Sequence, residues 1–274
     1  MSLLPLDSRQ GVFANTQMLL TDLDDTISTH GLLTDSVYQS LWALNKAGVK
    51  VIVVTGACAG WCDHLARSWP ITGVIGENGA FYFSREGDVA DHGKLQRQYW
   101  SSLEQLQQEQ QSLLGKFTDH FDDFDSYLTH DQHYRLAEVA VNVSQDLSQP
   151  DLARKAKVLN FCQQENISHS VSSIHINTWV SDNSKRQMCE RVVQGFFGKS
   201  LNELTDQVIY SGDSLNDEEM FSVLNLSVGV ANIAAVKDQM QSLPTYITPD
   251  SHGAGFEQIA EAIIADRNEA LKNN

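Results

Sequence analysis

The feature that most constrains the fold is an apolar run that ends abruptly in carboxylates. Residues 18–21 form this short run, and Asp22, Asp24 and Asp25 follow it. An apolar stretch of this length is typical of a parallel strand buried on both faces. Open α/β sheets bind ligands at the carboxyl ends of their strands, so Asp22 and Asp24 are predicted to line a binding site. Carboxylates this close require a cation or a shared proton.

The same arrangement recurs further along the chain. Residues 49–54 form a second apolar run, which ends at a hydroxyl and a glycine, Thr55 and Gly56. Residues 207–210 form another, and the acidic stretch of residues 211–217 follows it. Segments with apolar residues at helical spacing separate these runs, and such alternation is typical of a parallel sheet covered by helices. The predicted fold class is therefore α/β, with a doubly wound, Rossmann-like parallel sheet.

The pattern changes between residues 81 and 181. Glutamines crowd residues 96–111, and the strands predicted beyond them alternate apolar and polar residues, as half-buried antiparallel strands do. We expect residues 1–80 and 182–274 to form the catalytic core, and residues 81–181 to form an inserted, smaller α+β cap that selects the substrate. The expected cap elements are a helix carrying Tyr99, Leu103, Leu106 and Leu113, strands over residues 136–143 and 171–180, and a helix over residues 152–166.

The composition excludes several classes of protein. The chain has 274 residues, 42% of them hydrophobic, which is enough for sizeable cores and excludes a disordered chain. Its 19 Lys and Arg residues against 35 Asp and Glu residues give a net charge of −16, which argues against a nucleic-acid or anionic-membrane surface. The sequence shows no signal-like leader and no apolar run near the roughly 18 residues of a membrane span. We expect a cytoplasmic protein, a monomer or homodimer, with its four cysteines as reduced interior thiols and residues 1–16 as a loosely held arm.

The carboxylates have the chemistry of a phosphoryl-transfer site. Asp22 and Asp24 lie two residues apart, so one can attack a substrate while the other moves a proton. Asp22 and Asp213 supply the hard oxygen ligands that suit Mg²⁺. The strand ends and the helix start that we expect to meet in one pocket carry Asp22, Asp24, Thr55, Lys185, Asp213, Asn216 and Asp217.

A lysine is the expected cation of this pocket. Lys185 lies in the first turn of a predicted amphipathic helix, where its charge opposes the helix dipole, and that mild cost favours a functional role. Arg186 and Lys199 are the alternatives nearby. A metal ion and a lysine together neutralise a phosphate so that a carboxylate can attack it in line.

These residues resemble the haloacid-dehalogenase superfamily of phosphohydrolases, whose four sequence motifs all occur here in order. Residues 22–26 (DLDDT) resemble the first motif, Thr55-Gly56 the second, Lys185 the third, and residues 212–217 (GDSLND) the fourth. Four motifs in order are far more specific than a single DxDxT. The long interval before Lys185 is where the large α/β caps of subfamily IIB are inserted, and such caps imply small, soluble substrates.

The resemblance implies a role for each motif residue. Asp22 would form an aspartyl-phosphate, and Asp24 would protonate the leaving oxygen and then activate water. The implied binding residues are Thr55, Gly56, Lys185 and Asn216 for the substrate, and Asp22, Asp24 (through its backbone carbonyl), Asp213 and Asp217 for a Mg²⁺ cofactor.

The closest subfamily resemblance is to sucrose-phosphate and related sugar-phosphate phosphatases. It rests on the DLDDT start, on residues 212–221 and on residues 252–255 (HGAG). His175 and Asn177 alternate onto one face of a cap strand and could contact a sugar, although such residues also occur as ordinary sheet surface. The predicted function is Mg²⁺-dependent hydrolysis of a small phosphomonoester, a sugar phosphate. A phosphosugar mutase and a non-catalytic sugar-phosphate-binding sensor are the alternatives.

Overall fold

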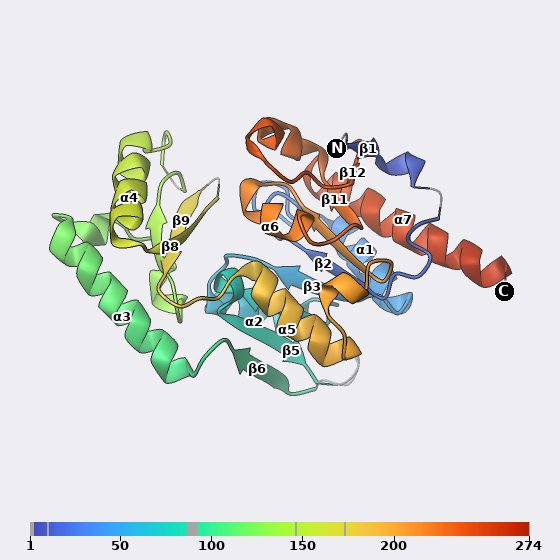
Figure 1. Cartoon of the computed structure of the whole chain (residues 1–274), viewed down its shortest axis with the longest axis horizontal. Coiled ribbons are helices and arrows are strands. Elements are labelled where there is room, and N and C mark those ends of the chain that lie inside the picture. Colours follow the sequence, from blue (N-terminus) through green and yellow to red (C-terminus); the bar gives the residue numbers. More distant parts are fainter. Residues whose placement is uncertain (1–2, 10, 87–92, 146, 173, 274) are drawn as a thin grey trace.

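The computed structural model describes residues 3–9, 11–86, 93–145, 147–172 and 174–273, which form a main unit and a small unit (Figure 1). Within these residues the main unit contains a nine-stranded sheet. From one edge to the other its strands are β1 (Leu4–Pro5), β12 (Tyr246–Ile247), β11 (Ser227–Gly229), β10 (Val208–Gly212), β2 (Met18–Thr21), β3 (Lys50–Val54), β4 (Gly73–Gly76), β5 (Phe81–Arg85) and β6 (Leu95–Tyr99).

Strand β2 lies in the middle of this sheet. It pairs in parallel with β3 on one side and with β10 on the other, and Met18 is opposite both Lys50 and Val208. The chain continues from β2 to β3 and β4 on one side, and only later adds β10, β11 and β12 on the other. Such a reversal of direction opens a crevice at the carboxyl ends of the two central strands. Asp22 and Asp213 therefore start from neighbouring strand ends, as the sequence predicts.

Helices cover both faces of the main sheet, which gives three layers (Figure 1). Leu19 packs into one apolar cluster with α1, α2 and α7, whereas its neighbours Met18 and Leu20 pack into the opposite cluster with α5 and α6. This alternation follows from the pleat of a strand, which turns successive side chains to opposite faces. The helices are α1 (Asp35–Lys46), α2 (Ala59–Ser68), α5 (Lys185–Phe197), α6 (Glu218–Phe221) and α7 (His252–Asn273).

The small unit has its own antiparallel sheet, in the order β7-β9-β8 (Figure 1). Helices α3 and α4 pack against it through Phe117 and Phe161, which join Val141 and Ile176 in a separate apolar cluster. The bounds are α3 (Leu103–His120), β7 (Val139–Asn142), α4 (Leu152–Glu165), β8 (Ser168–Val171) and β9 (His175–Trp179).

Three details differ from the sequence-based expectations. Strands β5 and β6 extend the main sheet by antiparallel pairing, so Phe81–Arg85 and Leu95–Tyr99 lie in that sheet, and Tyr99 is on a strand rather than on the glutamine-rich helix. Polar residues of the segment before residue 172 form a strand, β8, that the periodicity did not indicate. The N-terminal arm is docked, because β1 pairs with β12 and the Phe13 side chain is fully buried.

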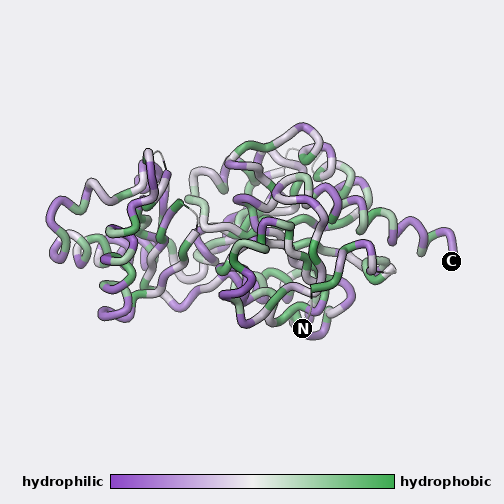
Figure 2. Tube along the Cα trace, turned by 90° about the horizontal axis from the view of Figure 1, so that it is seen from above, coloured by the Kyte–Doolittle hydropathy of each residue, from purple (hydrophilic) through white to green (hydrophobic). Residues whose placement is uncertain are grey.

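Hydropathy follows this architecture. Figure 2 shows apolar segments gathered inside the main unit, while the C-terminal end of α7 extends beyond it. Across the described residues, no helix combines the length and the apolar character that crossing a membrane requires.

Candidate active site

The carboxyl edge of the central strands holds the predicted nucleophile. Asp22 follows β2, its backbone N–H donates to the Ser211 carbonyl at 2.9 Å, and its side chain is buried. Lys185 Nζ lies 2.7 Å from Asp22 Oδ1 and is itself buried. Burial raises the pKa of Asp22 well above its ordinary value, and Lys185 opposes that rise while the neighbouring acids add to it. The site therefore holds more negative charge than its lysine balances.

Lys185, and neither of its sequence alternatives, reaches the site. Its Nζ also contacts Asn216 Oδ1 at 3.0 Å and Asp217 Oδ1 at 3.1 Å. Burial would lower the pKa of Lys185, but Asp217 and Asp22 outweigh that effect and raise it, so the ammonium stays charged. Arg186 and Lys199 are exposed to solvent. Three oxygen acceptors, one of them from Asp22, thus hold the Lys185 ammonium in place.

The loop after β10 is organised around Asp217. One Asp217 oxygen accepts the backbone N–H groups of Asp213 (3.0 Å) and Ser214 (3.1 Å), and the other accepts the Tyr210 hydroxyl besides Lys185. Gly212 is required here, because a Cβ at that position would lie 2.5 Å from Asp217 Cγ. Asp217 is fully buried and positions both the lysine and the loop.

The Asp213 carboxylate is held by two side chains from other parts of the main unit. Thr26 Oγ1 donates to its Oδ1 at 3.2 Å and Asn232 Nδ2 donates to its Oδ2 at 2.8 Å. Desolvation, helped by repulsion from Asp217 and Asp25, raises the pKa of Asp213 to about 7. A nearby cation would stabilise the ionised form of such a carboxyl.

Asp24 differs from both. Its side chain is exposed to solvent, and within the described residues no hydrogen bond to it is found. Surrounding atoms nevertheless displace enough water to raise its pKa, and Asp25 adds to this while Lys185 and Arg135 oppose it. A carboxyl with a raised pKa and no fixed partner suits proton transfer.

The second motif lies at the end of β3. Thr55 is buried, and its Oγ1 accepts the backbone N–H of Ala57 at 3.0 Å. The Gly56 carbonyl accepts two hydrogen bonds from the small unit, from Arg135 Nη1 and from Asn177 Nδ2, both at 2.9 Å. A Cβ on Gly56 would lie 2.7 Å from Asn177 Nδ2. The loop that carries Thr55 is therefore in direct contact with the small unit.

A buried polar network continues this contact. Glu77 accepts the backbone N–H groups of Leu136, Ala137 and Glu138. Arg135 Nη1 lies 2.7 Å from Glu138 Oε2, and Asn78 Nδ2 donates to Glu138 Oε1 at 2.6 Å. Burial raises the pKa of Glu138 to about 8, although Arg135 opposes the rise. The network joins the turn after β4 to the start of the small sheet.

The two predicted cap residues have different surroundings. Asn177 contacts the Gly56 carbonyl, as described above. His175 is buried on the same face of β9, and its Nε2 lies 2.6 Å from Gln145 Oε1 within the small unit. The structure thus brings Asn177 to the motif residues and pairs His175 with a residue of its own unit.

The acidic cluster fits a hard divalent cation. Asp22, Asp213 and Asp217 each offer a carboxylate oxygen, and these atoms lie within 4.8 Å of one another. Mg²⁺ prefers such oxygens and keeps several waters. Both oxygens of Asp217 already accept hydrogen bonds from the chain, so Asp22 and Asp213 are the better placed ligands.

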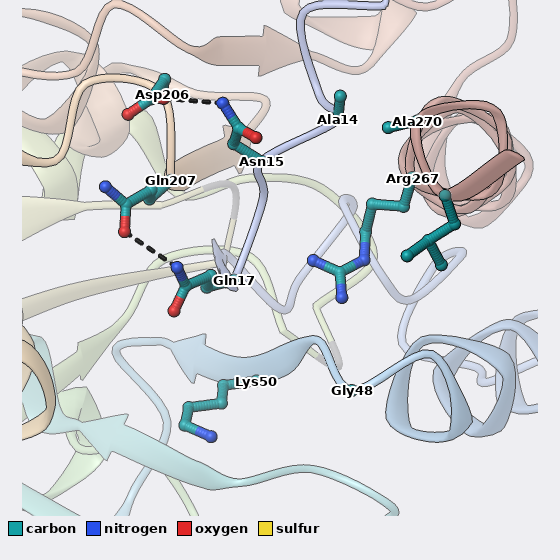
Figure 3. A pocket seen from close by; sticks show the side chains of 10 residues that line it. Ala14, Asn15, Gln17, Gly48, Lys50, Asp206, Gln207, Arg267 and Ala270 are labelled. Carbon is teal, nitrogen blue, oxygen red and sulfur yellow. Dashed lines mark hydrogen bonds between the residues drawn. The ribbon is translucent and has the colours of Figure 1, made fainter. Parts of the chain in front are cut away.

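A separate hollow of about 670 Å³ lies at the opposite edge of the main sheet (Figure 3). It is lined by Gln17 and Lys50, at the amino ends of β2 and β3, whereas Asp22 and Thr55 follow the carboxyl ends of the same strands. Its side chains pair with each other, as in the 2.9 Å bond from Gln17 to Gln207. The hollow therefore lies away from the acidic cluster.

Sequence reasoning missed several residues of the site. Arg135 stands in a segment without helical or strand periodicity, and Asn232 belongs to a short 3-10 helix (Ala231–Ala235), so no pattern singled them out. Glu77 and Asn78 are buried and have positive φ angles (42° and 48°), and no apolar periodicity marks them in the sequence. Such residues act through long-range contacts that a local pattern does not record.

Comparisons with known proteins agree with the fold and identify a family. The model of the haloacid dehalogenase-like hydrolase family matches residues 19–259. No curated protein matches the chain by sequence.

Many solved structures are similar to the chain, and three of them, each with a TM-score above 0.5, serve as examples. A Thermoplasma acidophilum protein has a TM-score of 0.65 at 17% identity, over 90% of this chain and 98% of its own. The sucrose-phosphatase of a Synechocystis species, solved with sucrose and phosphate, has 0.62 at 16%, over 90% and 98%. A subclass IIB sugar phosphatase of the same superfamily has 0.56 at 15%, over 90% and 98%. These likenesses show a shared fold, and because the family model spans most of the chain, the protein belongs to the haloacid dehalogenase-like hydrolases.

Proposed function

We propose that the protein is a Mg²⁺-dependent phosphatase that hydrolyses a small phosphomonoester, a sugar phosphate, through an aspartyl-phosphate. The observation that carries this proposal is the 2.7 Å contact of Lys185 with Asp22 inside a carboxylate cluster, beside the unpaired Asp24. Family membership supports hydrolysis, and the similar folds of a sucrose-phosphatase and a sugar phosphatase support the substrate class.

The acidic cluster would hold the metal. Asp22 and Asp213 would supply carboxylate oxygens, and the Asp24 backbone carbonyl would complete the protein ligands. Asp217 would support the site through its hydrogen bonds with Lys185 and with the backbone of the Asp213 loop. When bound, Mg²⁺ would neutralise charge on the transferring phosphoryl group.

The chain's own residues carry out two displacements. Asp22 attacks phosphorus, so a bond from its carboxylate oxygen forms as the ester bond to the sugar oxygen breaks. Asp24 gives its proton to the leaving oxygen, which would otherwise depart as an alkoxide. Asp24 then accepts a proton from water, the water oxygen attacks phosphorus, and the bond to Asp22 breaks to release inorganic phosphate. The raised pKa of Asp24 suits the first of these steps.

Substrate binding would use both units. Thr55, Gly56, Lys185 and Asn216 would hold the phosphoryl group from the main unit. His175 and Asn177 would face the sugar from the small unit, which we propose as the cap. Because β5 and β6 belong to the main sheet, we place the start of the cap after β6, at about residue 100, and its end near residue 181.

The proposal is tested by measuring phosphate release from a panel of sugar phosphates with Mg²⁺, for the wild type and for Asp22→Asn. We expect release by the wild type and its loss in the variant, because an amide cannot form the acyl phosphate. Undiminished release by Asp22→Asn would exclude the mechanism. Phosphate moved within the sugar without release would identify a mutase, and ligand-induced thermal stabilisation without turnover would identify a sensor.

A further inference from the structure

A cluster of metal-binding side chains lies next to the acidic site and takes no part in the proposed reaction. Asp25, in the turn after β2, has its Oδ1 at 3.5 Å from His252 Nδ1 and at 3.9 Å from His30 Nδ1. The two imidazole rings are 4.9 Å apart between centroids. The three ligand atoms all lie within 4.8 Å of one another.

The backbone holds these three side chains together. Asp25, His30 and His252 all have positive φ angles, of 57°, 51° and 55°, which residues other than glycine rarely adopt. The His30 backbone N–H donates to Asp25 Oδ1 at 3.3 Å, and the His252 backbone N–H donates to Asn232 Oδ1 at 2.9 Å. A Cβ in place of hydrogen at Gly253 would lie 2.8 Å from Val37 Cγ2, so the start of α7 packs closely on α1.

We infer that Asp25, His30 and His252 form a binding site for a transition-metal dication of the Zn²⁺ class. Two imidazoles and one carboxylate are a ligand set for such ions, which bind nitrogen more strongly than Mg²⁺ does. Ligand atoms about 2.0–2.1 Å from a tetrahedral metal lie about 3.4 Å from one another. The observed separations of 3.5 and 3.9 Å need only small rotamer changes to reach that geometry.

The remaining ligand position faces solvent. The His30 side chain is 79% exposed, and those of Asp25 and His252 are 27% and 22% exposed. Water can therefore complete the coordination. His252 Nδ1 also lies 3.2 Å from the Asp25 carbonyl, and a metal would replace this contact by taking the lone pair of the nitrogen.

The site is distinct from the acidic cluster but linked to it. Asn232 Nδ2 donates both to the Asp25 carbonyl, at 3.0 Å, and to Asp213 Oδ2, at 2.8 Å. The positive end of α7 opposes a cation at His252. The Asp25 carboxylate and the neighbouring acids offset that repulsion, so the local field still favours a dication.

Cobalt binding tests the inference, because Co²⁺ reports its ligands by visible absorption. The full chain, stripped of metal, is titrated with Co²⁺ while Mg²⁺ in excess fills the acidic cluster. We expect one equivalent of Co²⁺ to bind with the strong visible bands of a low-coordinate nitrogen and oxygen site. The thiolate charge-transfer bands should be absent, because all four cysteines are buried.

Single substitutions assign the ligands. His30→Ala and His252→Ala should each weaken Co²⁺ binding by more than about tenfold, since even changes behind a ligand cost 10–100-fold. His64→Ala, which removes an exposed histidine on α2, is the matched control and should bind as the wild type does. Because His30 is so exposed, His30→Ala should fold normally, which circular dichroism checks. Equal Co²⁺ affinity in wild type and His30→Ala, or only the weak bands of an all-oxygen octahedral ion, would overturn the inference. Neither result depends on phosphatase activity.

Discussion

At the scale of single residues, carboxylates that are neighbours in the sequence have different surroundings. Asp25 has a positive φ angle that turns its side chain toward His252, whereas Asp24 is exposed to solvent and lies within the electrostatic reach of Lys185 and Arg135. Asp22 is buried against Lys185. Backbone conformation and burial, rather than residue type, therefore give these three carboxyls their different surroundings.

The role of Asp24 depends on the leaving group. Asp24→Ala keeps the backbone carbonyl but removes the proton donor, so we expect sugar-phosphate turnover to fall by about 10²–10⁴-fold. The leaving group of a nitrophenyl phosphate is a stable anion that needs no proton. The formation of the aspartyl-phosphate from this substrate should therefore slow by less than about tenfold. Single-turnover kinetics on both substrates check this, with Asp122→Ala, an exposed acid, as the control. Equal losses on the two substrates would contradict proton donation by Asp24.

Metal affinity should depend on pH through Asp213. Its pKa is raised to about 7, so the carboxyl holds a proton below that pH and must lose it to bind Mg²⁺. The dissociation constant for Mg²⁺ should therefore rise as the pH falls below 7, by about tenfold per pH unit at most for one proton, and should level off above it. Calorimetric titration between pH 5.5 and 8.5 measures this, and Asp213→Asn should bind Mg²⁺ weakly at every pH. A constant affinity across the range would argue against Asp213 as a ligand.

At the scale of elements, the contact between the loop after β3 and the small unit is polar and buried. Arg135 supplies the positive charge among Glu77, Glu138 and Asp131 in this network of described residues, and it also donates to the Gly56 carbonyl. A buried carboxylate that loses its cation is strongly destabilising, more so than the pair is stabilising. Arg135 thereby fixes the loop of the second motif relative to the small sheet.

Removing Arg135 should destabilise the protein. Arg135→Ala leaves Glu77 and Glu138 buried without their cation, so we expect a loss of about 3–5 kcal/mol in the free energy of unfolding. Arg186→Ala, on the exposed face of α5, should change it by less than about 0.5 kcal/mol. Urea unfolding of both variants makes the comparison, and a loss of under about 1 kcal/mol in Arg135→Ala would show that water or rearrangement replaces the guanidinium.

Elements with strong local patterns could be predicted from the sequence, and elements defined by distant partners could not. Thr34 caps α1 by accepting the Val37 N–H at 3.3 Å, and β2 spans the residues that its apolar run indicates. Strand β6 was missed because its exposed glutamines resemble a helix surface and its pairing with β5 is not visible in its own sequence. Arg135 was missed because its bond to the Gly56 carbonyl joins residues that are far apart in the chain. The order of the motifs predicted Asp22, Lys185 and Asp213 as site residues. The hydrogen bonds from Tyr210 to Asp217 and from Asn232 to Asp213 form only in the folded chain, so no sequence pattern predicts them.

At the scale of the whole molecule, apolar packing divides the chain into two units. The main unit has one apolar cluster on each face of its sheet, and the small unit has a third between its sheet and helices α3 and α4. Leu106 and Ala137 are residues of the small unit that pack into a cluster of the main unit. The polar network around Arg135 and Glu77 also joins the two units. We therefore predict that either unit can lose its internal packing while the other unit stays folded.

Paired core substitutions test this division. Phe161 is buried in the cluster of the small unit and Phe256 in a cluster of the main unit, so truncating either to alanine should cost about 3–5 kcal/mol locally. Hydrogen exchange in Phe161→Ala should accelerate in β7, β9, α3 and α4 and stay unchanged in β2 and β3, because local opening follows cooperative units. Phe256→Ala should accelerate exchange in β2 and β3, which pack on α7. Phe161→Ala should also keep Mg²⁺ binding at the acidic cluster, since every carboxylate there belongs to the main unit. Uniform acceleration across both units in either variant would mean that they unfold as one, and the small unit would then be an extension of the main fold rather than a separate cap.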